Sequence, residues 1–75
     1  MITDLNKLPK DLGKKIHIER IKAEISQEEL AEWAGVSVAT LSKLERGVVL
    51  PTLETATRIA NALQLTLPEL FTFGY

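Results

Sequence analysis

Residues 26–47 read SQEELAEWAGVSVATLSKLERG, and this stretch decides the fold of the 75-residue chain. Apolar residues recur at helical spacing on both sides of Gly35, which predicts two short helices joined by a tight turn. Ala31 is small at the point where the second helix must cross closely, and the apolar Val36 follows the glycine. An ordinary helical hairpin is the alternative, but it does not require these three residues in register. The stretch therefore predicts a helix-turn-helix whose second helix keeps its outer face free.

Helix-capping signals place both helices of this motif. Ser26 and Glu29 form a reciprocal pair in which each side chain accepts a hydrogen bond from the other residue's backbone N–H. A helix is therefore expected over residues 27–34. Ser37 can cap a second helix, which is expected over residues 38–46 and stops at the glycine that follows.

Three further helices are expected outside the motif. Pro9 suits the first turn of a helix over residues 9–23. After the motif, Thr52 caps a helix whose apolar residues again recur at helical spacing. Thr66 and Glu69 form another reciprocal capping pair, which starts a short last helix. The sequence thus predicts five helices and no clear strand.

The size of the chain allows one domain with one small core. The sequence is 45% hydrophobic, and a domain this short hides only about 60% of the surface that its unfolded chain exposes. Such a domain gains stability from a partner subunit, so we expect a homodimer. The predicted architecture is all-α: an N-terminal arm over residues 1–8, a five-helix domain over residues 9–72 and a C-terminal tail over residues 73–75.

Composition excludes several classes of protein. The chain has no cysteine, which removes disulfide frameworks and thiolate zinc sites. No apolar run approaches the roughly 18 residues of a membrane span. The first residues lack the apolar block of a signal peptide. We therefore expect a cytoplasmic protein without a membrane partner.

The sequence shows no pattern typical of an enzyme or a cofactor site. His17 is the only histidine, and we expect it to be a surface residue of the first helix. The carboxylates are scattered, without a partnered nucleophile, a phosphate-binding glycine loop or the spacing of metal ligands. We therefore expect no catalytic residue, no metal and no cofactor.

The net charge of the whole chain does not favour binding to nucleic acid. Nine lysines and arginines against ten aspartates and glutamates give −1 at pH 7, whereas nucleic-acid binders usually carry a basic surface. The placement of the charges on the surface matters more than the net charge, because one cationic face can contact phosphate while acidic residues lie elsewhere. After Arg46 the only basic residue is Arg58, so positive charge is concentrated in the first two-thirds of the chain.

The chain resembles, from about Leu12 to Phe71, the Cro/C1-type (XRE, lambda-repressor-like) helix-turn-helix family of bacterial and phage transcription regulators. The segments that carry the resemblance are LGKKI in the first helix, SQEELA at the start of the second, AGVS at the turn, TLSKLERG in the recognition helix, and PTLETATRIANAL leading to LPELF. The resemblance implies a lambda-repressor-like domain that binds DNA with its second and third helices.

The resemblance also implies roles for particular residues. Gln27 would hold a DNA phosphate. Arg20 and Glu45 would form an ion pair that ties the first helix to the end of the third. The positions that would face the major groove are Val38, Ala39, Ser42 and Lys43.

The residues themselves support a DNA-facing side on the third helix. At about 100° per residue, Leu41 and Leu44 point one way, while the polar residues around Lys43 point the other. Lys43 is the candidate for a base contact, because a lysine in the major groove can donate to guanine O6 and N7. A solvated surface lysine is the alternative. The expected DNA-binding residues are Gln27, Ser37, Val38, Ala39, Thr40, Ser42, Lys43 and Arg46.

Three apolar features lie in or near the predicted DNA-binding motif. Val38 and Ala39 stand where relatives often place polar side chains that read base edges, and they could contact only thymine methyl groups. The connector VVL at residues 48–50 replaces basic or polar residues of many relatives. We expect it to pack under the following helix, with a partner surface as the alternative. Trp33 falls at the edge of the apolar stripe and is expected to cover the first helix or the core margin.

Two classes of function fit these features. The first is a sequence-specific transcriptional regulator, a repressor or the controller of a phage or restriction-modification locus, that acts as a homodimer on a near-palindromic operator in double-stranded DNA. The second is an antitoxin that binds a partner toxin and autoregulates its operon. Antitoxins commonly carry an extra segment for the partner, and the sequence shows none beyond FTFGY, so the regulator is favoured.

The C-terminal end is the predicted dimer interface. Three of the four aromatic residues lie in the last five positions, which is more apolar surface than a free tail should expose. A two-fold contact there would set two recognition helices at a fixed separation. The alternative is that these side chains fold back on the first helix of the same chain. The predicted interface residues are Leu67, Leu70, Phe71, Phe73 and Tyr75.

Overall fold

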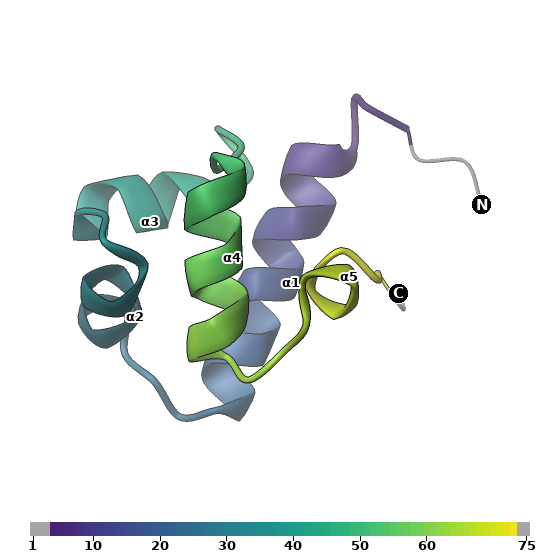
Figure 1. Cartoon of the computed structure of the whole chain (residues 1–75). Helices are drawn as coiled ribbons and strands as arrows, with labels where there is room; N and C mark the ends of the chain where they lie inside the picture. Colours follow the sequence, from purple (N-terminus) through teal and green to yellow (C-terminus); the bar gives the residue numbers. More distant parts are fainter. Residues whose placement is uncertain (1–3, 74–75) are drawn as a thin grey trace.

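Five α-helices follow one another along residues 4–73, the part of the chain that the computed structural model describes. They are α1 (Leu8–Lys22), α2 (Gln27–Ala34), α3 (Val38–Glu45), α4 (Leu53–Ala62) and α5 (Leu67–Leu70). In Figure 1, α4 stands in front of α1, with α2 and α3 on one side and α5 on the other. No strand occurs in residues 4–73, so the predicted all-α, five-helix architecture is confirmed.

The helices begin where the capping signals place them. The Ser26 hydroxyl accepts from the Glu29 backbone N–H at 3.0 Å, and the Glu29 carboxylate accepts from the Ser26 N–H at 3.1 Å. These two bonds satisfy free donors at the start of α2, which begins at Gln27 as predicted. The same reciprocal arrangement starts α5, with Thr66 and Glu69. The bounds of α1 and α3 differ from the predicted ones by a single residue, which is usual at helix ends.

The turn between α2 and α3 forms around Gly35. This residue ends α2 in the left-handed conformation, with φ at 73°, which glycine adopts without a steric penalty. In Figure 1, α2 is seen nearly end-on while α3 lies across the view, so the two helices cross steeply. The predicted helix-turn-helix is therefore present.

A small aliphatic core lies between the helices. Fully burying one leucine or isoleucine side chain stabilises a protein by about 1.5–3 kcal/mol. Every one of the five helices contributes at least one buried residue to this core. The buried hydrophobic residues are Leu12, Ile16, Leu30, Ala31, Ala34, Leu41, Leu44, Ala56, Ile59, Ala60, Leu63 and Leu70.

Gly13 allows α1 to approach the end of α3 closely. A Cβ atom on this residue would lie 2.8 Å from the backbone carbonyl oxygen of Glu45 and nearer still to that of Leu44. Backbone oxygens of a helix cannot move aside as a flexible side chain can. The absence of a side chain at Gly13 therefore sets the position of α3 relative to α1.

The expectation that Trp33 covers the core margin is wrong. Its side chain is 51% exposed and is not among the hydrophobic side chains that pack against the core, whereas a contact with α1 stays a prediction. The buried face of α2 is formed by Leu30, Ala31 and Ala34, and helical geometry places Trp33 roughly 100° from the centre of that face.

The expectation for residues 48–50 is wrong as well, because all three side chains are exposed rather than packed under α4. The backbone explains the difference. Gly47 adopts the left-handed conformation, and the N–H of Val48 donates to the carbonyl of Lys43 at 3.0 Å. This bond turns the chain sharply at the end of α3 and leaves the connector on the surface.

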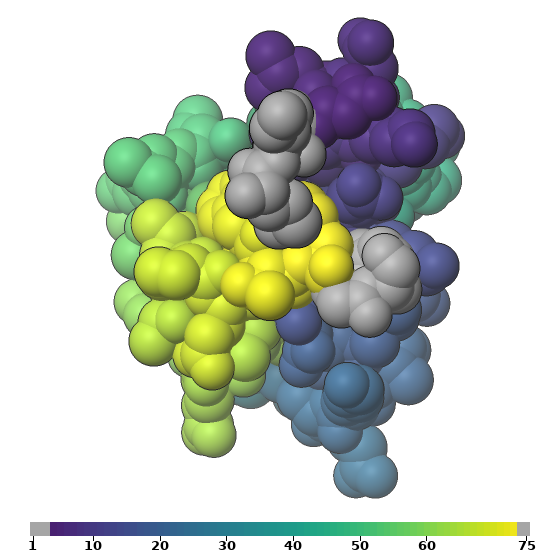
Figure 2. Space-filling view, turned by 90° about the vertical axis from the view of Figure 1, so that its right-hand side faces the viewer, coloured from purple at the N-terminus to yellow at the C-terminus, as the bar shows by residue number. Residues whose placement is uncertain are grey.

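The C-terminal residues pack largely within their own chain. Leu70 is 0% exposed, so its prediction as an interface residue is wrong: the end of α5 directs it into the core. Leu67, Phe71 and Phe73 are partly buried against that core. Figure 2 shows the last described residues, in yellow, at the centre of one face between α1 and the segment that carries α5. Tyr75 lies outside the described residues, and an interface through the other three side chains stays a prediction.

Over the part of the chain that the structure describes, no helix is both long enough and apolar enough to cross a bilayer.

Candidate DNA-binding surface

α3 has one buried side and one exposed side. Leu41 and Leu44 lie in the core. The opposite side is accessible, and Ser42 is half-buried at its margin. A ligand could therefore approach α3 along its length from outside. The exposed residues among those expected to bind DNA on and around this helix are Ser37, Val38, Ala39, Thr40, Lys43 and Arg46.

Several polar side chains on the exposed side are already held in place. The Ser37 hydroxyl accepts from the backbone N–H of Thr40 and donates to the Thr40 hydroxyl, both at 3.0 Å, so it caps α3. Arg46 Nε donates to the Ser42 hydroxyl at 3.2 Å. The Lys43 ammonium, by contrast, makes no hydrogen bond or ion pair within residues 4–73, which leaves all three of its donors to solvent or a ligand.

Gln27 lies at the start of α2, beside the end of α3. Its side-chain Nε2 donates to Glu45 Oε1 at 3.3 Å. An amide nitrogen carries two hydrogens, so this contact leaves a second donor. That donor stands at a helix N-terminus, where free backbone N–H groups and the helix dipole favour an anion. The expected role of Gln27 as a phosphate ligand is compatible with this position, and its contact with Glu45 was not predicted.

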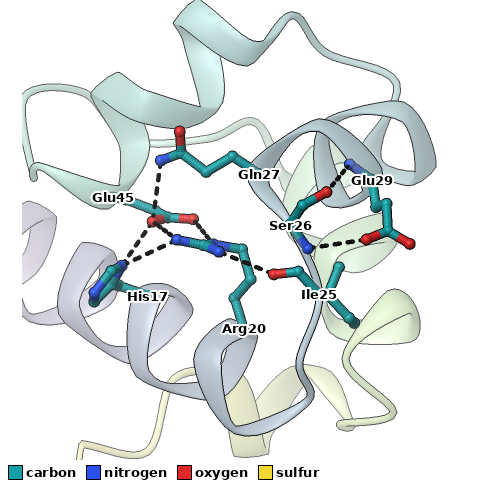
Figure 3. Close-up of polar contacts among 7 residues, drawn as sticks. All are labelled: His17, Arg20, Ile25, Ser26, Gln27, Glu29 and Glu45. Carbon is teal, nitrogen blue, oxygen red and sulfur yellow. Dashed lines mark hydrogen bonds and ion pairs between the residues drawn. The ribbon is translucent and has the colours of Figure 1, made fainter.

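A buried ion pair beneath Gln27 joins α1 to α3. Arg20 Nε donates to Glu45 Oε2 at 2.7 Å, and Arg20 Nη2 donates to Glu45 Oε1 at 3.1 Å. The exposed fractions of the two side chains are 10% and 4%. A third donor, Arg20 Nη1, bonds the Ile25 carbonyl at 2.9 Å and so holds the link between α1 and α2 (Figure 3). The ion pair that the sequence resemblance implied is present, with two parallel hydrogen bonds.

His17 contacts the same carboxylate. Its Nδ1 lies 2.9 Å from Glu45 Oε1 and 3.3 Å from Arg20 Nη2. In Figure 3, Gln27 and His17 reach the Glu45 carboxylate from different sides. The expected surface position is confirmed, because the side chain is 52% exposed, but its contact with Glu45 was not predicted. The available signal was the spacing of three residues between His17 and Arg20, which places both on one helix face.

The carboxylate of Glu45 is ionised in this network. Burial raises its pKa, but hydrogen bonds from Arg20, His17 and Gln27 outweigh that effect and hold the pKa below its ordinary value. The charged form of Glu45 thus holds three elements together: α1, α3 and the first residue of α2.

Further ion pairs join a lysine or arginine to a glutamate of the same helix. Lys15 and Lys22 lie near Glu19, and Arg58 pairs with Glu54. These partners reduce the positive charge available to phosphate away from α3. In residues 4–73, no three histidine, aspartate or glutamate side chains come together in a way that could hold a metal ion.

A model of the helix-turn-helix family HTH_3 matches residues 16–70, which include all of α2 to α5. An uncharacterized HTH-type transcriptional regulator of Mycobacterium tuberculosis is 37% identical over 59 residues, which cover 79% of this chain and 42% of the relative. The chain therefore spans about two-fifths of the length of this curated relative.

Two solved structures of similar size share the arrangement of helices. The restriction-modification controller protein C.AhdI from Aeromonas hydrophila is 28% identical with a TM-score of 0.77, and the match covers 81% of this chain and 92% of that one. The master regulator for biofilm formation SinR, solved in complex with DNA, is 29% identical with a TM-score of 0.75, and the match covers 81% and 98% of the two chains.

Proposed function

Because the chain belongs to the HTH_3 family of helix-turn-helix proteins, we propose that it is a transcriptional regulator that binds double-stranded DNA through α3. The observation that carries this proposal is the two-sided construction of α3. One side is held by the core and by the Arg20–Glu45 pair, and the other side carries an accessible Lys43. The similarity to SinR, a regulator solved in complex with DNA, supports DNA binding here.

In this proposal the residues divide between positioning and reading. Gln27 holds a backbone phosphate at the start of α2, which sets the depth of α3 in a major groove about 12 Å wide. Lys43 donates to the acceptors of a guanine. Val38 and Ala39 offer no donor and contact thymine methyl groups. The remaining polar residues of the surface reach phosphate or base edges, and they are Ser37, Thr40, Ser42 and Arg46.

We also propose that the protein acts as a homodimer on a near-palindromic operator. Two copies of α3 would then read half-sites about one helical turn apart. The small core supports this proposal, because a second subunit would bury further apolar surface. The partly buried Leu67, Phe71 and Phe73 are the described residues that would form the contact. The similarity to a restriction-modification controller supports a controller-type role.

A selection of bound duplexes from a random pool tests the DNA-binding proposal. We expect an enriched motif with two-fold symmetry, and binding that weakens steeply as salt rises, because phosphate contacts release counterions. The absence of any enriched motif would contradict sequence-specific regulation. A reporter placed behind the selected site then distinguishes repression from activation.

The double substitution Phe71→Ala and Phe73→Ala tests the interface. Sedimentation of the wild type should show a dimer, and the variant should be a folded monomer with weaker binding to a two-half-site duplex. A variant that stays a tight dimer would place the interface elsewhere. A variant that unfolds would show that the two rings serve the core of their own chain.

A further inference from the structure

The ion-pair network uses only one of the two nitrogens of His17. Nδ1 lies 2.9 Å from Glu45 Oε1 and 3.3 Å from Arg20 Nη2. The shorter distance, to a carboxylate oxygen, favours a proton on Nδ1, since two acceptors would otherwise face each other, and the Arg20 Nη2 donor lies farther from the same atom. Nε2 lies on the other side of the ring, turned away from the carboxylate in Figure 3. This nitrogen is therefore left to interact with something outside the network.

His17 stands next to the place where the proposed function puts a phosphate. His17 and Gln27 donate to the same oxygen of Glu45, so their side chains flank one carboxylate. Gln27 is the residue proposed to hold the DNA backbone. A phosphate oxygen only accepts hydrogen bonds, so a nitrogen that binds it must carry a proton. With Nδ1 already protonated, Nε2 carries one only in the imidazolium form.

We propose that His17 is a second ligand of the DNA backbone and that it binds phosphate as imidazolium. Nδ1–H donates to Glu45, and Nε2–H donates to a phosphate oxygen. The proton on Nε2 comes from solvent, so DNA binding is accompanied by proton uptake at this ring. The inference rests on the proposed DNA-binding function and adds to it a residue of α1 and a dependence on pH.

The direction of the pH dependence follows from linkage. A phosphate stabilises the charged ring, so the complex holds the proton more tightly than the free protein does. DNA affinity therefore falls as pH rises and the ring loses its second proton.

The charged groups that the structure records against His17 come from two helices. Arg20 lies on the same helix, and Glu45 lies on α3; these two charges are paired with each other. α5 also packs against α1, but its carboxylate, Glu69, accepts a hydrogen bond from the backbone N–H of Thr66. The ring thus faces a neutral pair on one side and solvent on the other.

The test compares the wild type with His17→Asn. An asparagine amide keeps an N–H donor near the position of Nδ1 but takes up no proton. The probe is a random-sequence duplex of about 20 base pairs at low salt, because phosphate contacts do not depend on sequence. The wild type should bind at least about tenfold more tightly at about pH 5.5 than at about pH 8, the size of one charge-assisted hydrogen bond. The variant should bind equally at both pH values.

Two further readouts separate a phosphate contact from a structural role. The slope of log affinity against log salt should be steeper by about 0.9 per protomer at the lower pH for the wild type only. Since His17 is the only histidine, NMR can follow its ring directly. Its titration midpoint should move to higher pH when the duplex is added, and the neutral ring of the free protein should carry its proton on Nδ1.

The outcomes distinguish this inference from the proposed function. Wild-type binding that is equal at both pH values, or a ring titration that DNA leaves unchanged, overturns the inference alone. Failure of the wild type to bind duplex at either pH contradicts the proposed function and the inference with it. Thermal unfolding without DNA is the control for His17→Asn, and if that variant does not fold, the titration of the wild-type ring decides.

Discussion

The two sides of α3 are stabilised in different ways. On the inner side, Leu41 and Leu44 are buried and the Glu45 carboxylate has hydrogen bonds from three side chains. On the outer side, the Lys43 ammonium has no partner in residues 4–73. A buried charge needs partners because water cannot solvate it, whereas an exposed ammonium is already solvated. The inner side can therefore hold the helix rigid while the outer side stays free for a ligand.

The largest expected effect is on the buried pair. Arg20→Ala or Glu45→Ala leaves the other charge poorly paired, and each should lower the free energy of unfolding by up to about 3–5 kcal/mol. Arg58→Ala is the matched control, because it removes the exposed Arg58–Glu54 pair and should cost no more than about 0.5 kcal/mol. Urea unfolding measures all three. Equal stabilities would contradict the structural role of the inner side.

A slightly smaller effect is expected for the core residue of the same helix. Leu41→Ala removes a fully buried side chain and should lower the free energy of unfolding by about 2–5 kcal/mol. Val38→Ala, one turn earlier on the exposed side, should change it by about 0.5 kcal/mol or less. Thermal unfolding distinguishes the two. A large loss at Val38 would show that the outer side also supports the fold.

The next effect is on DNA binding and tests the roles of residues on the outer side of α3. Lys43→Ala should reduce preference at one base position by about 1–3 kcal/mol without changing stability. Gln27→Ala should weaken binding to all sequences alike, because a phosphate contact carries no base information. Titrations with a selected and a scrambled duplex compare the two variants. Equal losses on both duplexes for Lys43→Ala would mean that the lysine contacts only phosphate.

The smallest effect is the acid dependence of the inner side. The pKa of Glu45 is held below its ordinary value in the folded protein, so its ionised form stabilises the fold above the ordinary glutamate pKa of about 4.3. That contribution is lost as pH falls through the lower, folded-state pKa. Glu45→Gln should therefore lose less stability than the wild type between neutral and acid pH. Parallel acid-unfolding curves would contradict the network.

Local signals in the sequence were sufficient for most of the fold. The reciprocal pair of Ser26 and Glu29 acts within one helical turn, so its presence could be inferred without knowing the rest of the structure. The same holds for the left-handed turn at Gly35. The division of α3 into two sides follows from the positions of Leu41 and Leu44 alone.

The contacts around Glu45 could not be inferred in this way. His17 and Gln27 are separated from it by 28 and 18 residues, and only the packing of three helices brings them together. The Arg20–Glu45 pair was available through family resemblance, since no local pattern indicates it. The predictions for two apolar residues were wrong for a related reason. Hydrophobicity alone does not show whether Trp33 lies beside the core or outside it, and it does not show that the Leu70 side chain points inward.

Backbone NMR of the protein during titration with duplex DNA tests the central claim most directly. Amide signals at Gln27, along the exposed side of α3 and at Arg46 should change most, because these groups would lie at the DNA. Signals of α4, which packs against α2 and α5, should change little. Changes centred on α4 or on the connector at residues 48–50, with α3 unaffected, would contradict the assignment of α3 as the DNA-binding helix.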